Sequence, residues 1–232
     1  GSEAGEFDIA LDAAQELAGD RAVRADAAVA FDAAFALAVC FERMGNNLQA
    51  LRILDDALEQ HADAPPSFAM LYALNGVAAT ALGAFHRLHG LDAEQEASAH
   101  LATARSAAER ARVLLDEFES PVYRVAIDGN LGETLTYQGE LAAASTLLQD
   151  ALRRAVDVGA SAHAHRVRAS IGAWMVCSGR HTEALHLLEQ LIIEAGDAGP
   201  HSTRIRAHHT AYLAARAIDR HELALAHHEA YE

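Results

Sequence analysis

The sequence predicts an all-α fold, a solenoid of stacked helical hairpins, and three observations point to it. A pattern returns about every 40 to 50 residues: a small residue, a turn residue seven positions later, then Ala, then a large apolar residue. The composition is rich in Ala and includes only 4 Pro, and no long alternating run of Val, Ile or Thr occurs. A fixed period of this length is typical of units that bury their apolar faces only by stacking on one another. We therefore expect one elongated domain over residues 8–232.

The elements follow from the helix breakers. Residues 1–7 (GSEAGEF) resemble a cloning scar and are left out of the fold. The remaining chain divides into about eleven helices. The first five are expected at 8–19, 22–44, 48–61, 67–89 and 92–118; later ones meet at Gly139, near Gly159, at Gly179, near 196–200 and at Asp219. The sixth helix starts at Ser120-Pro121, because Ser is a good N-cap and Pro is tolerated in the first turn.

Small residues and alanines recur at fixed distances from these turns. The first helix of a hairpin carries a small residue seven before the turn, at Ala38, Gly83, Gly132 and Gly172. The second helix carries Ala five after the turn, at Ala50, Ala144, Ala184 and Ala224, and usually a large residue four positions later. Small side chains allow two antiparallel helices to approach closely.

These hairpins resemble tetratricopeptide repeats (TPR). The resemblance implies a right-handed α-solenoid of about five TPR-like hairpins over residues 22–232, preceded by one extra helix. Two hairpins depart from the pattern. The hairpin around Gly90 needs a two-residue insertion, which moves the small position to Ala97, and the last one has Asp219 in place of Gly and His228 at the large apolar position.

The last hairpin carries a more specific resemblance. Residues 219–231 read DRHELALAHHEAY, with Ala-His-His-Glu followed by an aromatic residue, and look like the final repeat of bacterial sensor regions that precede a GGDEF diguanylate cyclase domain. The resemblance implies a non-catalytic sensory and protein-interaction module that regulates cyclic-di-GMP synthesis, in a chain that continues past Glu232. The alternative is a standalone peptide-binding adaptor or the receptor part of a transcription regulator. Leu223 and Leu225 are then candidates for cover by the continuation or by a second copy, as in a homodimer.

Charge and composition limit the partners. The formal net charge of −15 argues against nucleic acid and anionic membrane surfaces, because both need a basic footprint. All 18 basic residues are Arg, which is typical of a GC-rich bacterial gene. No leader and no run of about 18 apolar residues is seen, and Cys40 and Cys177 are far apart in apolar stretches. We expect a cytoplasmic protein with reduced thiols, no nucleic-acid partner and no membrane partner.

Catalytic and metal-binding motifs are not evident in the sequence. No Gly-rich phosphate loop, His-Glu-x-x-His helix or Gly-x-Ser-x-Gly elbow occurs, so we expect no enzyme activity in this module and no cofactor. Six of the 14 His gather between residues 201 and 228. The adjacent pairs His208-His209 and His227-His228 point in different directions on a helix, which favours solvated or groove-facing imidazoles. A metal enzyme using His209 and His228 stays an alternative.

Helical spacing from the small packing residues marks one face of each first helix as the candidate lining of a concave groove. Its residues include Arg43, Arg87, Gly129, Asn130, Glu133, Thr136, Tyr137, Arg166, Ser170, Cys177, Arg206, His209, Thr210 and Arg216. We expect these positions to be exposed, and we take Arg87, Tyr137, Arg166, Arg206, His209 and Arg216 as the ligand-binding candidates.

The basic members of this face suggest a ligand class. Arg166, Arg206, His209 and Arg216 are predicted to form a basic patch for a protein or peptide ligand with an acidic segment, because Arg offers planar, bidentate donors. The alternative is that these Arg side chains pair with Glu and Asp of neighbouring helices. Trp174 is interpreted as a packing residue between hairpins, with a groove aromatic as the alternative.

Overall fold

The computed structural model describes residues 25–89, 93–196 and 201–231, with the isolated positions 12, 16 and 20. Every regular element in these ranges is an α-helix, which confirms the all-α prediction. The helix expected at 8–19 and the turn residue Gly90 lie almost wholly outside the described residues. The chain divides into two compact units, Gly1–Glu119 (unit 1) and Ser120–Glu232 (unit 2).

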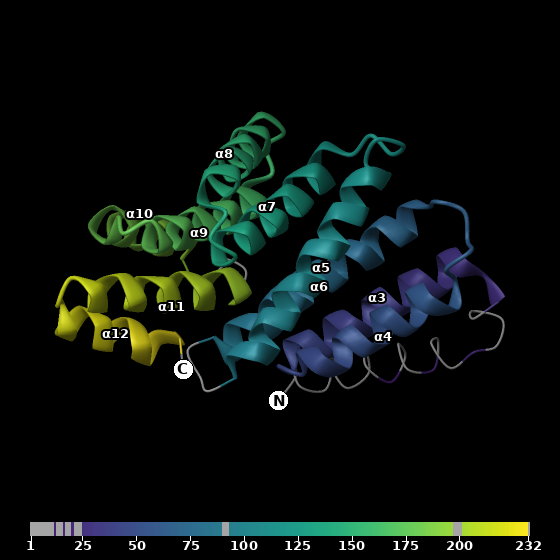
Figure 1. The fold of residues 1–232 in the computed structure, drawn as a ribbon, viewed down its shortest axis with the longest axis horizontal. Coiled ribbons are helices and arrows are strands. Elements are labelled where there is room, and N and C mark those ends of the chain that lie inside the picture. Colours follow the sequence, from purple (N-terminus) through teal and green to yellow (C-terminus); the bar gives the residue numbers. More distant parts are fainter. Residues whose placement is uncertain are drawn as a thin grey trace. The chain divides into compact units, whose positions relative to one another are not determined.

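The described residues of unit 1 form two hairpins. They are built from α3 (Ala27–Arg43) with α4 (Asn47–Gln60) and from α5 (Phe68–Leu88) with α6 (Glu94–Leu114) (Figure 1). Helix α3 begins where the Asp26 carboxylate accepts hydrogen bonds from two backbone N–H groups, and the Ser67 hydroxyl caps α5 in the same way. Both starts follow from the preference for short polar side chains at a helix N-cap.

Helix α5 is the apolar centre of unit 1. It packs against α3, α4 and α6. By length and hydropathy alone it is the one helix among the described residues that could cross a membrane, but 67% of its most apolar window is buried inside the fold. A helix that is apolar on all sides is also what the centre of a packed core requires.

Unit 2 contains three successive hairpins: α7 (Pro121–Tyr137) with α8 (Leu141–Asp157), α9 (Ser161–Cys177) with α10 (His181–Ala195), and α11 (His201–Ala217) with α12 (His221–Tyr231) (Figure 1). The first helices form a continuous row, because α7 contacts α9 and α9 contacts α11. As predicted, Ser120 caps α7 and Pro121 occupies its first turn.

The small residues of the repeat make room for a leucine of the same hairpin. A Cβ added at Gly132 would lie 2.7 Å from Leu148 Cδ2, and one at Gly172 would lie 2.6 Å from Leu188 Cδ2. These distances leave no space for a side chain, so the predicted close approach is confirmed in both hairpins. Gly83 differs, because a Cβ added there would overlap Asn47 Nδ2 of α4. It therefore makes room for the neighbouring hairpin.

The turns within the hairpins use the left-handed backbone region. Gly139 and Gly179 have φ values of 82° and 76°, and Asp219, the equivalent residue of the last hairpin, has φ 58°. Asp tolerates this region better than most L-residues, so the turn is kept without its Gly. The packing of the last hairpin does change, because the buried residues of α12 are Ala224 and His227, whereas Leu148 of α8 and Leu188 of α10 are fully buried. A buried Leu contributes about 1.5–3 kcal/mol.

Candidate functional site

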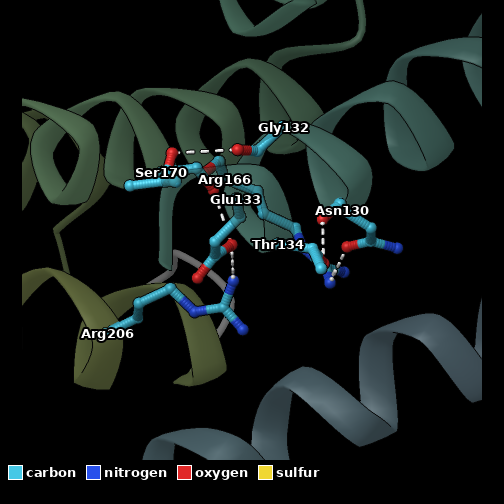
Figure 2. A network of polar contacts seen from close by, with 8 residues as sticks. Asn130, Gly132, Glu133, Thr134, Arg166, Ser170 and Arg206 are labelled. Atoms are coloured by element: carbon cyan, nitrogen blue, oxygen red, sulfur yellow. Dashed lines mark hydrogen bonds and ion pairs between the residues drawn. The ribbon is translucent and has the colours of Figure 1, made fainter. Parts of the chain in front are cut away.

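The row of first helices in unit 2 carries a set of polar side chains that meet one another. Asn130 and Glu133 lie one turn apart on α7, Arg166 and Ser170 lie one turn apart on α9, and Arg206 projects from α11. Residues three or four apart share a helix face, so each helix presents its members in one direction. We call these five residues the polar network (Figure 2).

Glu133 is the centre of the polar network. Its Oε2 accepts a hydrogen bond of 2.7 Å from Ser170 Oγ and one of 2.5 Å from Arg206 Nη1, so three helices are joined through one carboxylate oxygen. Beside it, Arg166 Nη2 donates to Asn130 Oδ1 at 2.7 Å (Figure 2). Charge-assisted bonds of this kind are stronger than neutral ones and fix the orientation of the groups they join.

Most of the polar network is buried, which corrects the expected exposure for this part of the predicted face. Other members of that face are exposed as expected, namely Arg43, Arg87, Cys177 and Arg216. Glu133 is fully buried, and Asn130 and Ser170 are each 1% exposed. The face of α7 that was assigned to an open groove meets side chains of α9 and α11, and this removes it from solvent. Thr136 and Thr210 of the predicted face are also buried. The two guanidinium groups are less enclosed: Arg166 is half-buried, and the Arg206 side chain is 12% exposed.

Two weakly acidic side chains beside the polar network, Tyr137 and Cys177, stay protonated. Burial raises the pKa of Tyr137 far above its usual value; the Glu133 carboxylate raises it further and Arg206 opposes the shift. Partial desolvation also raises the pKa of the Cys177 thiol, although this residue keeps an exposed surface. Tyr137 is therefore a neutral phenol, and Cys177 is not activated as a thiolate nucleophile. The chemistry available here is hydrogen bonding and charge, presented by Arg166 and Arg206.

The remaining candidates lie elsewhere. Arg216 Nη1 donates to the Tyr212 hydroxyl at 2.9 Å, with its guanidinium 5.4 Å from the centre of that ring. His209 lies against Tyr231, with 5.2 Å between ring centres. Both contacts belong to the α11–α12 hairpin, whereas Arg166 and Arg206 contact residues of α7. Arg87 belongs to unit 1, where its exposed side chain lies beside Gly45 in the α3–α4 turn.

Trp174 is a packing residue, as interpreted from the sequence. It lies against the cluster formed by Val125, Leu148, Ala151, Ala155 and Val167. Its Nε1 donates to the Leu141 backbone carbonyl at 2.9 Å, and the Arg180 guanidinium lies 5.3 Å from its ring centre. The indole therefore helps to join α9 to the start of α8.

The histidines of the last hairpin include a contact that the sequence did not reveal. His208 of α11 and His227 of α12 face each other, with 3.1 Å between their Nδ1 atoms, and His227 is buried, so the solvated interpretation is wrong for His227. The two members of each adjacent His pair do point in different directions, since His208 meets His227 whereas His209 and His228 contact Tyr rings. Which imidazoles meet depends on the register between α11 and α12. Within the described residues, no three His, Cys, Asp or Glu side chains are arranged to hold a metal ion.

Comparison with known proteins supports the fold. No family model and no curated protein matches the chain. Among solved structures, the TPR-like repeats of a Podosopora anserina protein described as a putative kinesin light chain are similar, with a TM-score of 0.53 at 15% identity over 86% of this chain and 92% of that one. A variant of the same repeats gives a TM-score of 0.55, also at 15% identity, over 85% of this chain and 91% of that one. The all-helical solenoid of TPR-like hairpins predicted from the sequence is thereby confirmed at the level of the fold.

Proposed function

We propose that this chain is a non-catalytic protein-interaction module that binds an extended peptide segment of its partner along the first helices of unit 2. The TPR-like fold supports the general statement, because stacked hairpins of this kind build extended binding surfaces. The polar network supports the location. It spans α7, α9 and α11, which belong to three successive hairpins.

A buried ion pair is weak evidence for stability but fits a positioning role. Taking a carboxylate and a guanidinium out of water costs about as much as their attraction returns, so an apolar pair would hold the helices together equally well. Glu133 bonds Arg206 at one fixed atom while the Arg206 side chain remains 12% exposed. Arg166 and Arg206 bring two guanidinium groups to this surface of an otherwise acidic chain, which favours an acidic peptide.

Arg166 offers the sharpest test of this surface. Reversing the charge at Arg206 would place two carboxylates together at the buried Glu133, so lost binding could reflect lost folding. Arg166 bonds the neutral Asn130 and is half-buried. Arg168, two residues further along α9, is the matched control, because it is also a partly buried Arg but bonds Glu194 of α10.

The experiment is a selection of random peptides displayed on phage against the purified chain, followed by affinity measurement on the selected peptides. We expect acidic peptides whose dissociation constants rise about tenfold or more with Arg166→Ala, because a hydrogen bond to a charged group is worth about 1.5–3 kcal/mol. Arg168→Ala should leave them unchanged. Equal affinities for the wild type and Arg166→Ala would contradict the proposed site.

We further propose that the module regulates a C-terminal signalling domain, with a diguanylate cyclase as the candidate, and that it works in the cytoplasm. The support is the resemblance of residues 219–231 to the last repeat of such sensor regions. The test is to sequence the source gene past the codon for Glu232. A GGDEF-bearing domain there would support cyclase regulation; a stop codon or a DNA-binding domain would overturn it and favour the adaptor or transcription-regulator alternative.

A further inference from the structure

Two imidazoles meet in the interface of the last hairpin. The Nδ1 atoms of His208 on α11 and His227 on α12 are 3.1 Å apart, a hydrogen-bond distance. Such a bond requires one Nδ1 to carry a proton and the other to be bare. The accepting ring must therefore be neutral, and a second proton between the two nitrogens breaks the contact.

The surroundings indicate which ring donates. His227 is 8% exposed, and its Nε2 has no hydrogen-bond partner among the residues that the structure describes. A buried bare acceptor is tolerated better than a buried N–H without an acceptor. We assign the proton to His227 Nδ1, which donates to the bare Nδ1 of His208. A proton added to His208 then removes the acceptor, and one added to His227 buries an N–H without a partner.

The charges around the pair act in both directions. Burial lowers the pKa of His208, and His227 and Arg204 lower it further. Burial also lowers the pKa of His227, and Glu189 of α10 opposes that shift. A lowered folded-state pKa means that the unfolded interface binds more protons in acid. The stabilisation is therefore complete above about pH 6.5, the ordinary pKa of His, and is lost as the pH falls below it.

The packing of α12 depends more on polar rings than that of α8 and α10, the second helices of the two preceding hairpins. Within unit 2, the described residues of α12 pack against α11, and its buried side chains are Ala224 and His227. Rings make further contacts between the two helices, because His228 stacks on Tyr212 at 5.3 Å between centres and Tyr231 lies against His209. Leu223 of α12 is partly buried against the core cluster. Imidazole rings thus occupy part of an interface in which α8 and α10 bury Leu148 and Leu188.

We propose that the α11–α12 hairpin is an acid-sensitive contact: on mild acidification His208 and His227 take up protons, and α12 separates from α11 while α7 to α10 remain folded. The separation would withdraw Ala224 from the core cluster that it shares with Ala211, Ala214 and Ala215 of α11.

Hydrogen exchange measured by mass spectrometry on the whole chain between pH 7.5 and 5.0, corrected for intrinsic exchange rates, tests the proposal. We expect the opening of α12 to increase with acidity by up to about a hundredfold per pH unit, since each proton taken up contributes at most a factor of ten. Amides of α9 should stay protected. His227→Asn keeps a hydrogen-bonding atom near the Nδ1 position and should reduce the increase to at most about tenfold per pH unit.

Two further variants complete the experiment. His221→Asn alters an exposed His on the same helix and should keep the full dependence. Glu189→Gln removes the carboxylate that favours the His227 cation and should increase the opening of α12 at pH 5.5. The proposal is overturned if α12 opens no more at pH 5.5 than at pH 7.5, or if His227→Asn retains the full slope. If His227→Asn already leaves α12 unprotected at pH 7.5, Glu189→Gln decides, and an unchanged or reduced opening overturns the proposal.

Discussion

Glu133 and Arg206 show how one buried pair can be costly to break and cheap to replace. The carboxylate is fully buried, and it accepts from Arg206 and Ser170 at the same oxygen. Removing one partner leaves an unpaired charge inside the fold, whereas replacing both by apolar groups removes the desolvation cost as well. Ser170 would not be left unpaired, since its hydroxyl also lies 3.3 Å from the Arg166 carbonyl oxygen.

Arg206→Met should therefore lower the free energy of unfolding by about 3 kcal/mol or more, and the double variant Glu133→Leu, Arg206→Met should recover most of that loss. Urea unfolding followed by Trp174 fluorescence measures both, because the only Trp lies in unit 2. A double variant as unstable as the single one would show that the pair itself supplies net stability.

At the scale of the helix, sequence spacing predicted the face but not its surroundings. Counting from Gly132 and Gly172 grouped Asn130, Glu133 and Ser170 on one face of their helices, because helical periodicity is local, and in the structure this face of α7 meets α9. Burial of that face depends on how closely α7, α9 and α11 pack, which spacing within one helix does not contain. The contact between His208 and His227 was missed for the same reason.

The turn positions were easier to predict from the sequence than the packing, and Asp219 offers a test of the turn conformation. This residue adopts a φ of 58° at the position that Gly179 occupies with a φ of 76° in the preceding hairpin. Asp219→Gly should stabilise unit 2 by up to about 1 kcal/mol, because Gly has no Cβ penalty in this region. Gly179→Asp should destabilise it by a similar amount, although nothing lies within 4 Å of the added Cβ. Thermal unfolding of the two variants measures both changes. An unchanged melting temperature for Gly179→Asp would contradict the expected backbone penalty for a side chain at positive φ.

Charge is unevenly distributed over the whole molecule. Residues 1–119 contain 8 Arg against 20 Asp and Glu, a net charge of −12, whereas residues 120–232 contain 10 Arg against 13, a net charge of −3. The second segment also contains 10 of the 14 His. Burial lowers the pKa of His163, His208 and His227 in unit 2, and that of His89 in unit 1. Protons taken up near pH 6 therefore act mainly on unit 2.

Unit 2 should consequently lose stability first when the pH falls. The lowered pKa values mean that stabilisation is present above about pH 6.5 and declines below it. Between pH 7.5 and 5.5, the urea midpoint reported by Trp174 should fall by on the order of 0.5 M, allowing for solvent screening of these partly exposed rings. The matched reporter is Trp174→Phe combined with Tyr72→Trp, which moves the fluorophore to α5 of unit 1. The urea midpoint of this variant should move less, because burial lowers the pKa of one described His in unit 1 but of three in unit 2. Equal shifts would mean that the two units respond to acid as one.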